Sequence, residues 1–258
     1  MVKNFTDLTG RVAVVIGGTS GIGRALSIGM AEAGADVVAS GRRQNLCEEV
    51  AEQITALGRQ SLAHSVNIQE RASIDVLRDA VLAKFGHIDI LVNAAGQTFR
   101  KPTKDVEEAA WNQVMDVNLT GILRSCQSFY EPLVKSGHGR VVNIASLSSF
   151  VALLEVAAYC ASKAAVLSLT KNLAIEWAKD GINVNAIAPG VFPTELNASL
   201  LNGTERGREF IARTPMRRFG RTEELVGAAV LLASDAASFI TGQSIAVDGG
   251  FLAAGVTN

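Results

Sequence analysis

Short apolar runs recur along the chain, separated by longer segments in which apolar and polar residues are mixed. The runs do not alternate between polar and apolar positions, and the stretch from Arg11 to Ile16 is typical of them. A strand that is apolar throughout is buried on both faces, as in a parallel sheet covered by helices. Seven strands are predicted in this way, at residues 11–16, 35–40, 61–66, 88–93, 140–144, 183–188 and 244–247.

The segments between these runs favour helices. Glycines at positions 34, 58 and 86 follow the ends of the first three, where a glycine commonly closes a helix. Helices are predicted at residues 24–33, 44–57, 70–85, 107–135, 157–179 and 223–232.

This alternation of strands and helices predicts an α/β fold. Right-handed crossovers between parallel strands give a doubly wound (Rossmann) sheet of about seven strands, with helices on both faces. Ligands of such a sheet bind at the carboxyl ends of its strands. The 258 residues contain no repeats, linkers or low-complexity segments, so a single domain is expected over residues 1–258.

A glycine-rich loop follows the first predicted strand and precedes the first predicted helix: Gly17-Gly18-Thr19-Ser20-Gly21-Ile22-Gly23. Its glycines let the backbone turn tightly and approach a pyrophosphate, and the helix N-terminus offers free N–H groups. Without its context such a loop is more often a plain tight turn. The strand before it and the helix after it favour dinucleotide binding.

Tyr159 and Lys163 are four residues apart in the predicted helix 157–179, so they project from one face. A free phenol has a pKa of about 10, and a nearby ammonium group is expected to lower it toward neutrality. Ser146 follows the strand at 140–144, where its hydroxyl could hold a substrate oxygen. Such a pair arises often by chance, so the catalytic interpretation depends on the rest of the chain.

Together these motifs resemble the short-chain dehydrogenase/reductase family. The resemblance extends from about Leu8 to Phe251. It implies an oxidoreductase that transfers a hydride between a nicotinamide cofactor and a secondary alcohol or ketone. The motifs that carry it are Ser146, Tyr159-x-x-x-Lys163, the glycine loop, the Asn93-Ala94-Ala95-Gly96 turn, Asn118, and Pro189-Gly190 followed by Thr194.

Three positions depart from the family pattern. Ile16 stands where a Thr is usual before the first glycine, which removes one hydroxyl from the loop. Asn67 stands where an Asp that contacts the adenine is common, and an amide can make a similar contact. Ala94 replaces a second Asn.

The resemblance also implies the roles of individual residues. Ser146, Tyr159, Lys163 and Asn118 are the expected catalytic residues, with Asn118 holding a water that joins Lys163 to solvent. A flap over the substrate is expected at about residues 191–214, and a homotetramer is expected. The implied cofactor-binding residues are Gly17, Thr19, Ser20, Gly21, Ile22, Gly23, Ser40, Arg42, Arg43, Asn67, Asn93, Ala94, Gly96, Tyr159, Lys163, Pro189, Gly190 and Thr194.

The end of the second predicted strand bears on the choice of cofactor. In NAD enzymes an acidic residue there binds the adenosine ribose and repels the additional phosphate of NADP. Here Gly41 stands at that place, between Ser40 and Arg42, and Arg43 follows. The planar fork of Arg42 suits a phosphate, and Ser40 could add a hydroxyl contact. NADP is therefore the preferred cofactor and NAD a possible one, unless the two arginines merely begin a solvated helix.

The substrate is less well defined. Residues 213–220 and 247–252 resemble those of the gluconate 5-dehydrogenase branch and similar sugar-acid dehydrogenases, which favours a sugar acid or polyol. The 3-oxoacyl carrier-protein reductases have a related ending and are the alternative. A redox sensor that binds a dinucleotide without turnover is an alternative of another class. Arg100 is either a clamp for a substrate carboxylate or part of a solvated charged loop.

Composition excludes several other classes. The net charge of −1 gives no electrostatic support for nucleic acid or an anionic membrane. Neither an N-terminal signal segment nor an apolar run long enough to cross a membrane is found. The three scattered cysteines indicate reduced thiols in the cytoplasm, and the three histidines lack metal-ligand spacing, so no metal is expected.

Overall fold

The computed structural model describes residues 4–195 and 197–255. Both ends of the expected domain 1–258, and position 196 of the expected flap, lie outside the described residues. Within them the strands form one sheet in the order β2-β1-β3-β4-β5-β6, and every neighbouring pair is parallel. The strands are β1 (Val12–Ile16), β2 (Asp36–Ser40), β3 (Ile90–Asn93), β4 (Arg140–Ile144), β5 (Asn183–Pro189) and β6 (Ser244–Val247).

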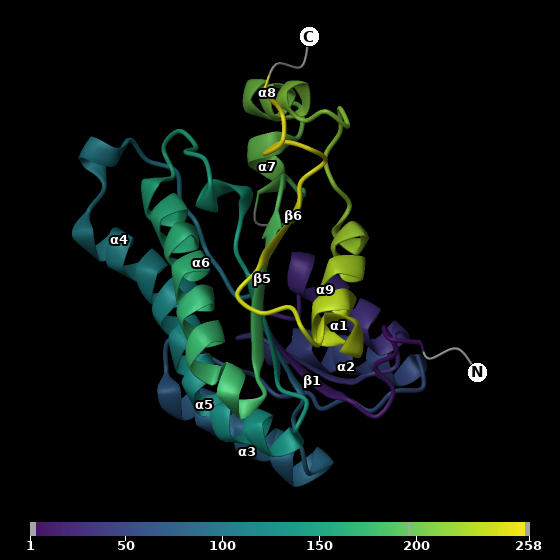
Figure 1. The fold of residues 1–258 in the computed structure, drawn as a ribbon. Helices are drawn as coiled ribbons and strands as arrows, with labels where there is room; N and C mark the ends of the chain where they lie inside the picture. Colours follow the sequence, from purple (N-terminus) through teal and green to yellow (C-terminus); the bar gives the residue numbers. More distant parts are fainter. Residues whose placement is uncertain (1–3, 196, 256–258) are drawn as a thin grey trace.

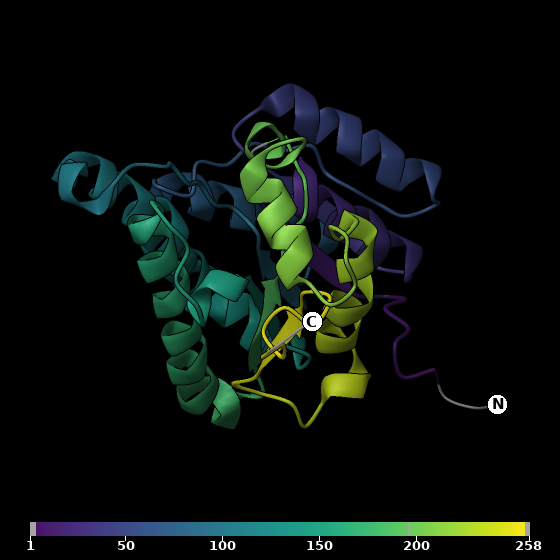
Figure 2. The same ribbon diagram turned by 90° about the horizontal axis from the view of Figure 1, so that it is seen from above.

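Helices cover both faces of this sheet, as the alternating pattern predicts (Figure 1). α3 (Arg71–Phe85), α5 (Gly121–Ser136) and α6 (Ala157–Trp177) lie on one face. α1 (Gly21–Glu32), α2 (Gln44–Ala56) and α9 (Val226–Ala233) lie on the other. The view from above in Figure 2 shows the two layers of helices with the strands between them.

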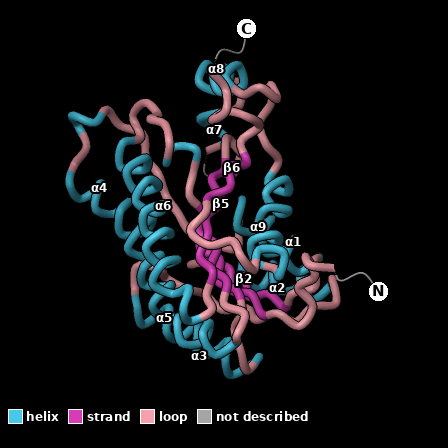
Figure 3. Tube along the Cα trace, in the orientation of Figure 1, coloured by secondary structure: helices cyan, strands magenta, loops and turns pink. Residues whose placement is uncertain are grey.

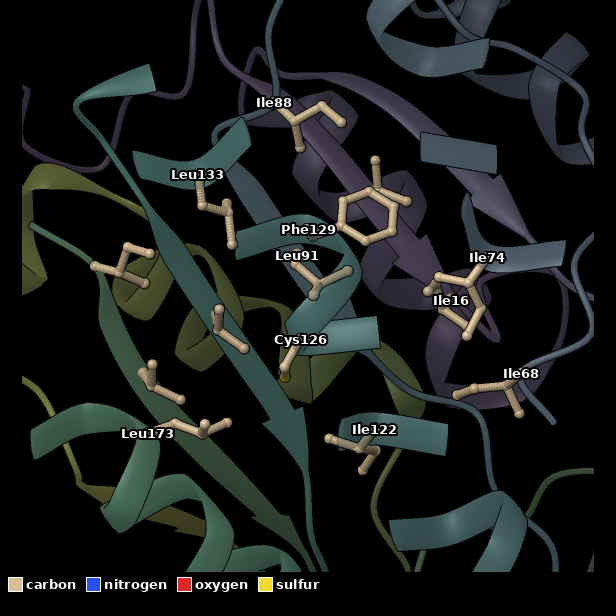
Figure 4. Close-up of a cluster of buried hydrophobic side chains, with 14 of the residues drawn as sticks. Ile16, Ile68, Ile74, Ile88, Leu91, Ile122, Cys126, Phe129, Leu133 and Leu173 are labelled. Carbon is tan, nitrogen blue, oxygen red and sulfur yellow. The ribbon is translucent and has the colours of Figure 1, made fainter. Parts of the chain in front are cut away.

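Each face of the sheet has its own apolar core. Strand side chains such as Val14 and Leu91 pack toward α3, α5 and α6, and Phe129 of α5 is fully buried among them (Figure 4). Val15 and Ile90 pack toward α1, α2 and α9. Neighbouring strand residues thus face opposite cores, which explains why the strands are apolar throughout.

The order of the strands places a ligand site at a defined edge. β1 lies between β2 and β3, and the chain reverses direction across the sheet there. Ile16 and Asn93 are register partners, so the carboxyl ends of β1 and β3 lie side by side. The segments after them lead to helices on opposite faces, and in doubly wound sheets the crevice at such a point is where a ligand binds.

One predicted strand is wrong. Residues 61–66 run beside β2 without forming a regular ladder. Main-chain bonds join Val37 N to Gln60 O and Val66 N to Gly41 O, at 3.1 and 2.9 Å. Between them, the hydroxyls of Ser61 and Ser40 donate to main-chain carbonyls across the gap. Hydrogen bonds from serine hydroxyls thus take the place of regular main-chain pairing between strands, which an apolar pattern does not reveal.

Two other segments are more structured than the sequence predicts. The expected helix at 107–135 is divided into α4 (Glu108–Met115), a π-helical turn at Asp116–Thr120, and α5. The expected flap contains α7 (Ala198–Leu201) and α8 (Glu205–Arg213), which Figure 3 shows as helices beyond the carboxyl ends of β5 and β6. No helix in the described ranges is long and apolar enough to cross a membrane.

Candidate active site

The glycine loop packs directly against the turn that follows β3. Gly17 has φ +84°, and a Cβ there would lie 2.6 Å from Cα of Ala95. Gly17 N and Gly18 N both donate to Ser40 O, at 2.7 and 3.0 Å, which fixes the loop beside β2. The close approach explains the need for glycine at this position. It brings the loop and the Asn93–Gly96 turn together at the crevice.

The start of the flap also reaches this loop. A Cβ on Gly21, the first residue of α1, would lie 3.2 Å from Cγ2 of Thr194. Thr194 N donates to Asn197 Oδ1 at 2.8 Å, which holds the segment in place. Pro189 ends β5, and Gly190 N donates to Val247 O at 2.9 Å. The structure therefore gathers these expected cofactor residues at the carboxyl edge of the sheet.

Ser146, Tyr159 and Lys163 meet above β4. Ser146 follows β4, and its hydroxyl oxygen accepts a bond from Ser148 N at 3.1 Å. It also hydrogen-bonds to the phenol of Tyr159. Lys163 lies one turn further along α6, and its ammonium group is 5.8 Å from the centre of the Tyr159 ring. The predicted catalytic group is thus assembled from β4 and α6.

The electrostatic part of the sequence prediction is wrong for this structure. Burial raises the pKa of Tyr159 above its usual value, against a smaller lowering by the Ser146 hydrogen bond. Burial also lowers the pKa of Lys163 to about 8. The ammonium group donates to Ile144 O at 2.7 Å, so this hydrogen bond goes to the main chain and not to the phenol. The spacing of the two groups was predictable from the sequence, but their burial was not.

Asn118 lies in the π-helical turn between α4 and α5 and is fully buried. Its amide pairs with the peptide of Gln97, with Nδ2 donating to Gln97 O at 2.9 Å and Oδ1 accepting from Gln97 N at 2.8 Å. Nδ2 also donates to the Ser162 hydroxyl at 3.0 Å. Asn118 therefore connects the turn after β3 with α6.

Two contributors to this arrangement were not identified from the sequence. Ser162 accepts from Asn118 and donates to Tyr159 O at 2.7 Å, so it joins the buried amide to the helix that carries the phenol. Gln97 supplies the peptide that Asn118 holds. The position of Ser162 next to Lys163 was the available signal, but serines are common and this one does not stand out.

Several expected cofactor residues use their side chains elsewhere. Asn93 is fully buried and donates to Asn143 Oδ1 at 2.9 Å, so its amide faces the core. The Ser40 hydroxyl donates to His64 O at 2.7 Å, which contradicts the expected contact of this group with a cofactor. Asn67 donates to Glu70 Oε1 at 2.7 Å near the start of α3. Asn93 and Ser40 could therefore contact a cofactor only through their main-chain atoms.

The arginines at the end of β2 point to solvent. Arg42 and Arg43 are exposed, and neither has an ion pair or side-chain hydrogen bond with another described residue. A Cβ on Gly41 would lie 2.6 Å from the Thr19 hydroxyl, so the glycine loop and the start of α2 are adjacent. A basic group beside a phosphate-binding loop is suited to a further phosphate.

Arg100 is engaged by another side chain. Its Nε lies 2.5 Å from Oε2 of Glu155, and 43% of the Arg100 side chain is exposed. An exposed guanidinium in an ion pair agrees with the solvated charged loop, while the role of Arg100 as a clamp for a substrate carboxylate stays a prediction. Among the described residues, no group of three His, Cys, Asp or Glu side chains is placed to hold a metal ion.

Comparison with known proteins identifies the family. Residues 16–252 match the family described as enoyl-(acyl carrier protein) reductase. A 2-dehydro-3-deoxy-D-gluconate 5-dehydrogenase of Dickeya dadantii is 40% identical over 256 residues, which are 98% of this chain and 100% of that relative. The chain belongs to the short-chain dehydrogenase/reductase family. The resemblance drawn from the motifs is confirmed.

Other members of the short-chain dehydrogenase/reductase family match the chain over nearly its whole length. A D-threitol dehydrogenase of Mycolicibacterium smegmatis is 39% identical and covers 95% of this chain and 94% of its own. The crystal structure of a gluconate 5-dehydrogenase from Burkholderia cenocepacia, in complex with NADP and tartrate, is 38% identical with a TM-score of 0.94. It covers 98% of this chain and 99% of its own. The short-chain dehydrogenase/reductase described here is therefore an NAD(P)-dependent oxidoreductase acting on CH–OH groups.

Proposed function

We propose that this short-chain dehydrogenase/reductase transfers a hydride between NADP and a secondary alcohol of a sugar acid or polyol. The observation that carries the proposal is full-length similarity to dehydrogenases of 2-dehydro-3-deoxy-D-gluconate, gluconate and D-threitol, together with the assembled Ser146, Tyr159 and Lys163. To reduce a carbonyl, the protein needs two neighbouring hydroxyl groups that donate hydrogen bonds to the substrate oxygen, and a buried ammonium group beside them.

The residues divide the reaction between them. The Ser146 and Tyr159 hydroxyls hydrogen-bond to the substrate oxygen, and Tyr159 gives its proton to that oxygen during reduction. The bound nicotinamide supplies or accepts the hydride. Lys163 stabilises the phenolate left on Tyr159 and contacts the nicotinamide ribose, while Asn118 fixes α6 and holds the water that links Lys163 to solvent. In oxidation the same groups act in reverse.

The glycine loop and its neighbours would hold the cofactor. Gly17 packs against Ala95, and the loop leads directly into the N-terminus of α1, whose free N–H groups would bind the pyrophosphate. Thr194, which lies beside Gly21, would contact the nicotinamide carboxamide. Asn67 would contribute to the adenine contact with the part of its amide that Glu70 does not use.

Preference for NADP is proposed to depend on Arg42. Gly41 lacks the carboxylate that would repel the additional phosphate, and Arg42 is exposed beside the loop. The test compares kcat/KM for NADP and NAD in Arg42→Ala and in the matched variant Arg43→Ala. Arg42→Ala should shift the ratio toward NAD by tenfold or more, about 1.4 kcal/mol, and Arg43→Ala by less. Equal shifts would remove Arg42 as the selective contact.

The substrate class is tested with a panel. Sugar acids, their keto forms, polyols and acetoacetyl thioesters are scored by the absorbance of the reduced nicotinamide. Sugar acids or polyols should give the highest kcat/KM. Preferred turnover of the thioesters would instead assign the chain to the 3-oxoacyl carrier-protein reductases, and turnover of none would favour the redox sensor.

We further propose a cytoplasmic homotetramer. Two large apolar side chains, Ile175 at 80% and Phe239 at 102% exposure, support an association surface. A Cβ on Gly242 would lie 3.4 Å from Ala174, so the loop after α9 that carries Phe239 and the end of α6 that carries Ile175 are adjacent. The three cysteines Cys47, Cys126 and Cys160 are all free, which is usual for a reducing compartment.

A further inference from the structure

The ion pair between Arg100 and Glu155 joins two segments that lead to the catalytic group. Arg100 is the fourth residue after Gly96, and Glu155 is the fourth before Tyr159. Four residues span at most about 14 Å when fully extended. A Cβ on Gly96 would lie 3.7 Å from Nζ of Lys163, so that turn itself faces the active site. Each partner of the ion pair therefore lies within about 14 Å of a residue at the catalytic group.

The segment that carries Glu155 is held on both sides. Lys101 N donates to Glu155 O at 2.8 Å, and Arg206 of the flap helix α8 donates to Leu154 O at 3.2 Å. Glu155 has φ +65°, a conformation that is unfavourable for a residue other than glycine. These contacts keep its carboxylate beside Arg100, between the loop after β3 and the flap.

Both basic residues of the loop after β3 are paired with carboxylates. Lys101, the next residue, is paired with Glu107 at 2.5 Å, as Arg100 is with Glu155. A substrate carboxylate that approaches Arg100 therefore meets a guanidinium already neutralised, and the like charge of Glu155 opposes it. An uncharged polyol experiences neither effect.

We propose that Glu155 sets the charge selectivity of the substrate site by neutralising Arg100. The site then accepts uncharged polyols as well as sugar acids, because Arg100 offers the acid no unpaired positive charge. This inference rests on the proposed function, since it requires sugar acids and polyols to occupy the site. Glu155 is a specificity-determining residue and does not contact the reacting atoms.

The test compares kcat/KM for D-gluconate with kcat/KM for D-threitol. Glu155→Gln should raise this ratio by about two- to fivefold, the scale of a partly exposed ion pair, through a lower KM for D-gluconate. Arg100→Ala should lower the ratio. In the double variant, Glu155→Gln should have no further effect, because the group it neutralises is gone.

Two controls separate charge from structure. Glu155→Gly removes the carboxylate and suits the positive φ, so it should raise the ratio as Glu155→Gln does. Glu107→Gln removes the matching carboxylate of the neighbouring pair and unpairs Lys101 instead of Arg100, so it should raise the ratio by less than Glu155→Gln does. An unchanged or lower ratio in Glu155→Gln, with both compounds turned over by the wild type, would overturn the inference and keep the proposed function. Turnover of D-threitol but not of D-gluconate would overturn the inference and the proposal that sugar acids are substrates. Turnover of neither compound would overturn the inference and the proposed function.

Discussion

At the scale of single residues, the chemistry depends on how deeply the phenol and the ammonium group lie. Burial keeps the pKa of Tyr159 above its usual value and lowers that of Lys163 to about 8. A phenol that keeps its proton at neutral pH suits the reduction of a carbonyl, in which Tyr159 is the proton donor. Oxidation needs the phenolate, so the rate of oxidation should rise with pH.

The lowered pKa of Lys163 has a consequence for stability. Between about pH 8 and the ordinary pKa of 10.5, the unfolded chain holds a proton on Lys163 that the folded chain has lost. The free energy of unfolding therefore rises with pH in this interval, by up to about 3 kcal/mol at its upper end. The raised pKa of Tyr159 opposes this above about pH 10, so the comparison stops there.

Lys163→Met removes the titrating group and keeps most of the side chain. Urea denaturation of the wild type and the variant at several pH values between about 7 and 10 measures the effect. The wild type should gain stability relative to Lys163→Met as the pH rises. Parallel curves for the two proteins would show that burial does not perturb Lys163.

At the scale of elements, the site depends on close contacts between segments that are distant in sequence. Asn118, placed by the π-helical turn, ties the turn after β3 to α6 through Gln97 and Ser162. The Ser149 hydroxyl donates to Lys163 O at 2.7 Å, which ties α6 to the segment after β4. These bonds set the position of Tyr159 relative to Ser146.

The contact between the glycine loop and the turn after β3 can be tested by a matched pair of variants. Gly17 and Gly58 both have positive φ, of +84° and +77°, but only a Cβ on Gly17 would meet another segment. Both Gly→Ala changes should cost about 1–2 kcal/mol through the backbone conformation. Gly17→Ala should also displace the Ala94–Ala95 peptide and weaken NADP binding by tenfold or more. Fluorescence titration with NADPH measures this, and equal affinity in the two variants would contradict it.

The elements also show which features of the fold could be predicted from sequence. The strands ending at Ile16 and Ile144 were identifiable because apolar runs buried on both faces leave a clear pattern. The parallel sheet and the place of the ligand site at the carboxyl ends of its strands followed from general rules of α/β folds, whereas the order of the strands was not predicted. The segment at 61–66 was misassigned because serine hydroxyls join it to β2, with Ser61 donating to Val37 O and Ser40 of β2 donating to His64 O, which an apolar pattern cannot distinguish from a strand.

The site was predictable to the extent that it depends on local spacing. Tyr159 and Lys163 are adjacent because they are one helical turn apart. The inward direction of the Ser40 hydroxyl, the core position of the Asn93 amide and the pairing of Arg100 with Glu155 depend on packing between distant segments. An Asn is unfavourable inside a helix because its side chain competes for main-chain hydrogen bonds. Asn118 was therefore the one local sign that a π-helical turn interrupts the predicted helix.

At the scale of the whole molecule, the apolar side chains of Ile175 and Phe239 predict association. Light scattering coupled to size exclusion should give a tetramer for the wild type. Replacing both residues, as Ile175→Ser with Phe239→Ser, should produce a smaller species that keeps its helical circular dichroism. A control that replaces the exposed Val76 by Ser, on the outer side of α3, should leave the tetramer intact. A monomeric wild type would contradict the proposed assembly.

The central claim is that this molecule carries out hydride transfer with Tyr159 as the acid–base residue. Steady-state turnover of NADP with the best sugar acid or polyol of the panel, in the wild type and in Tyr159→Phe, tests it most directly. Phe keeps the ring and loses the proton, so kcat should fall by at least about 10²-fold while NADPH affinity changes little. Turnover in Tyr159→Phe near that of the wild type would contradict the account.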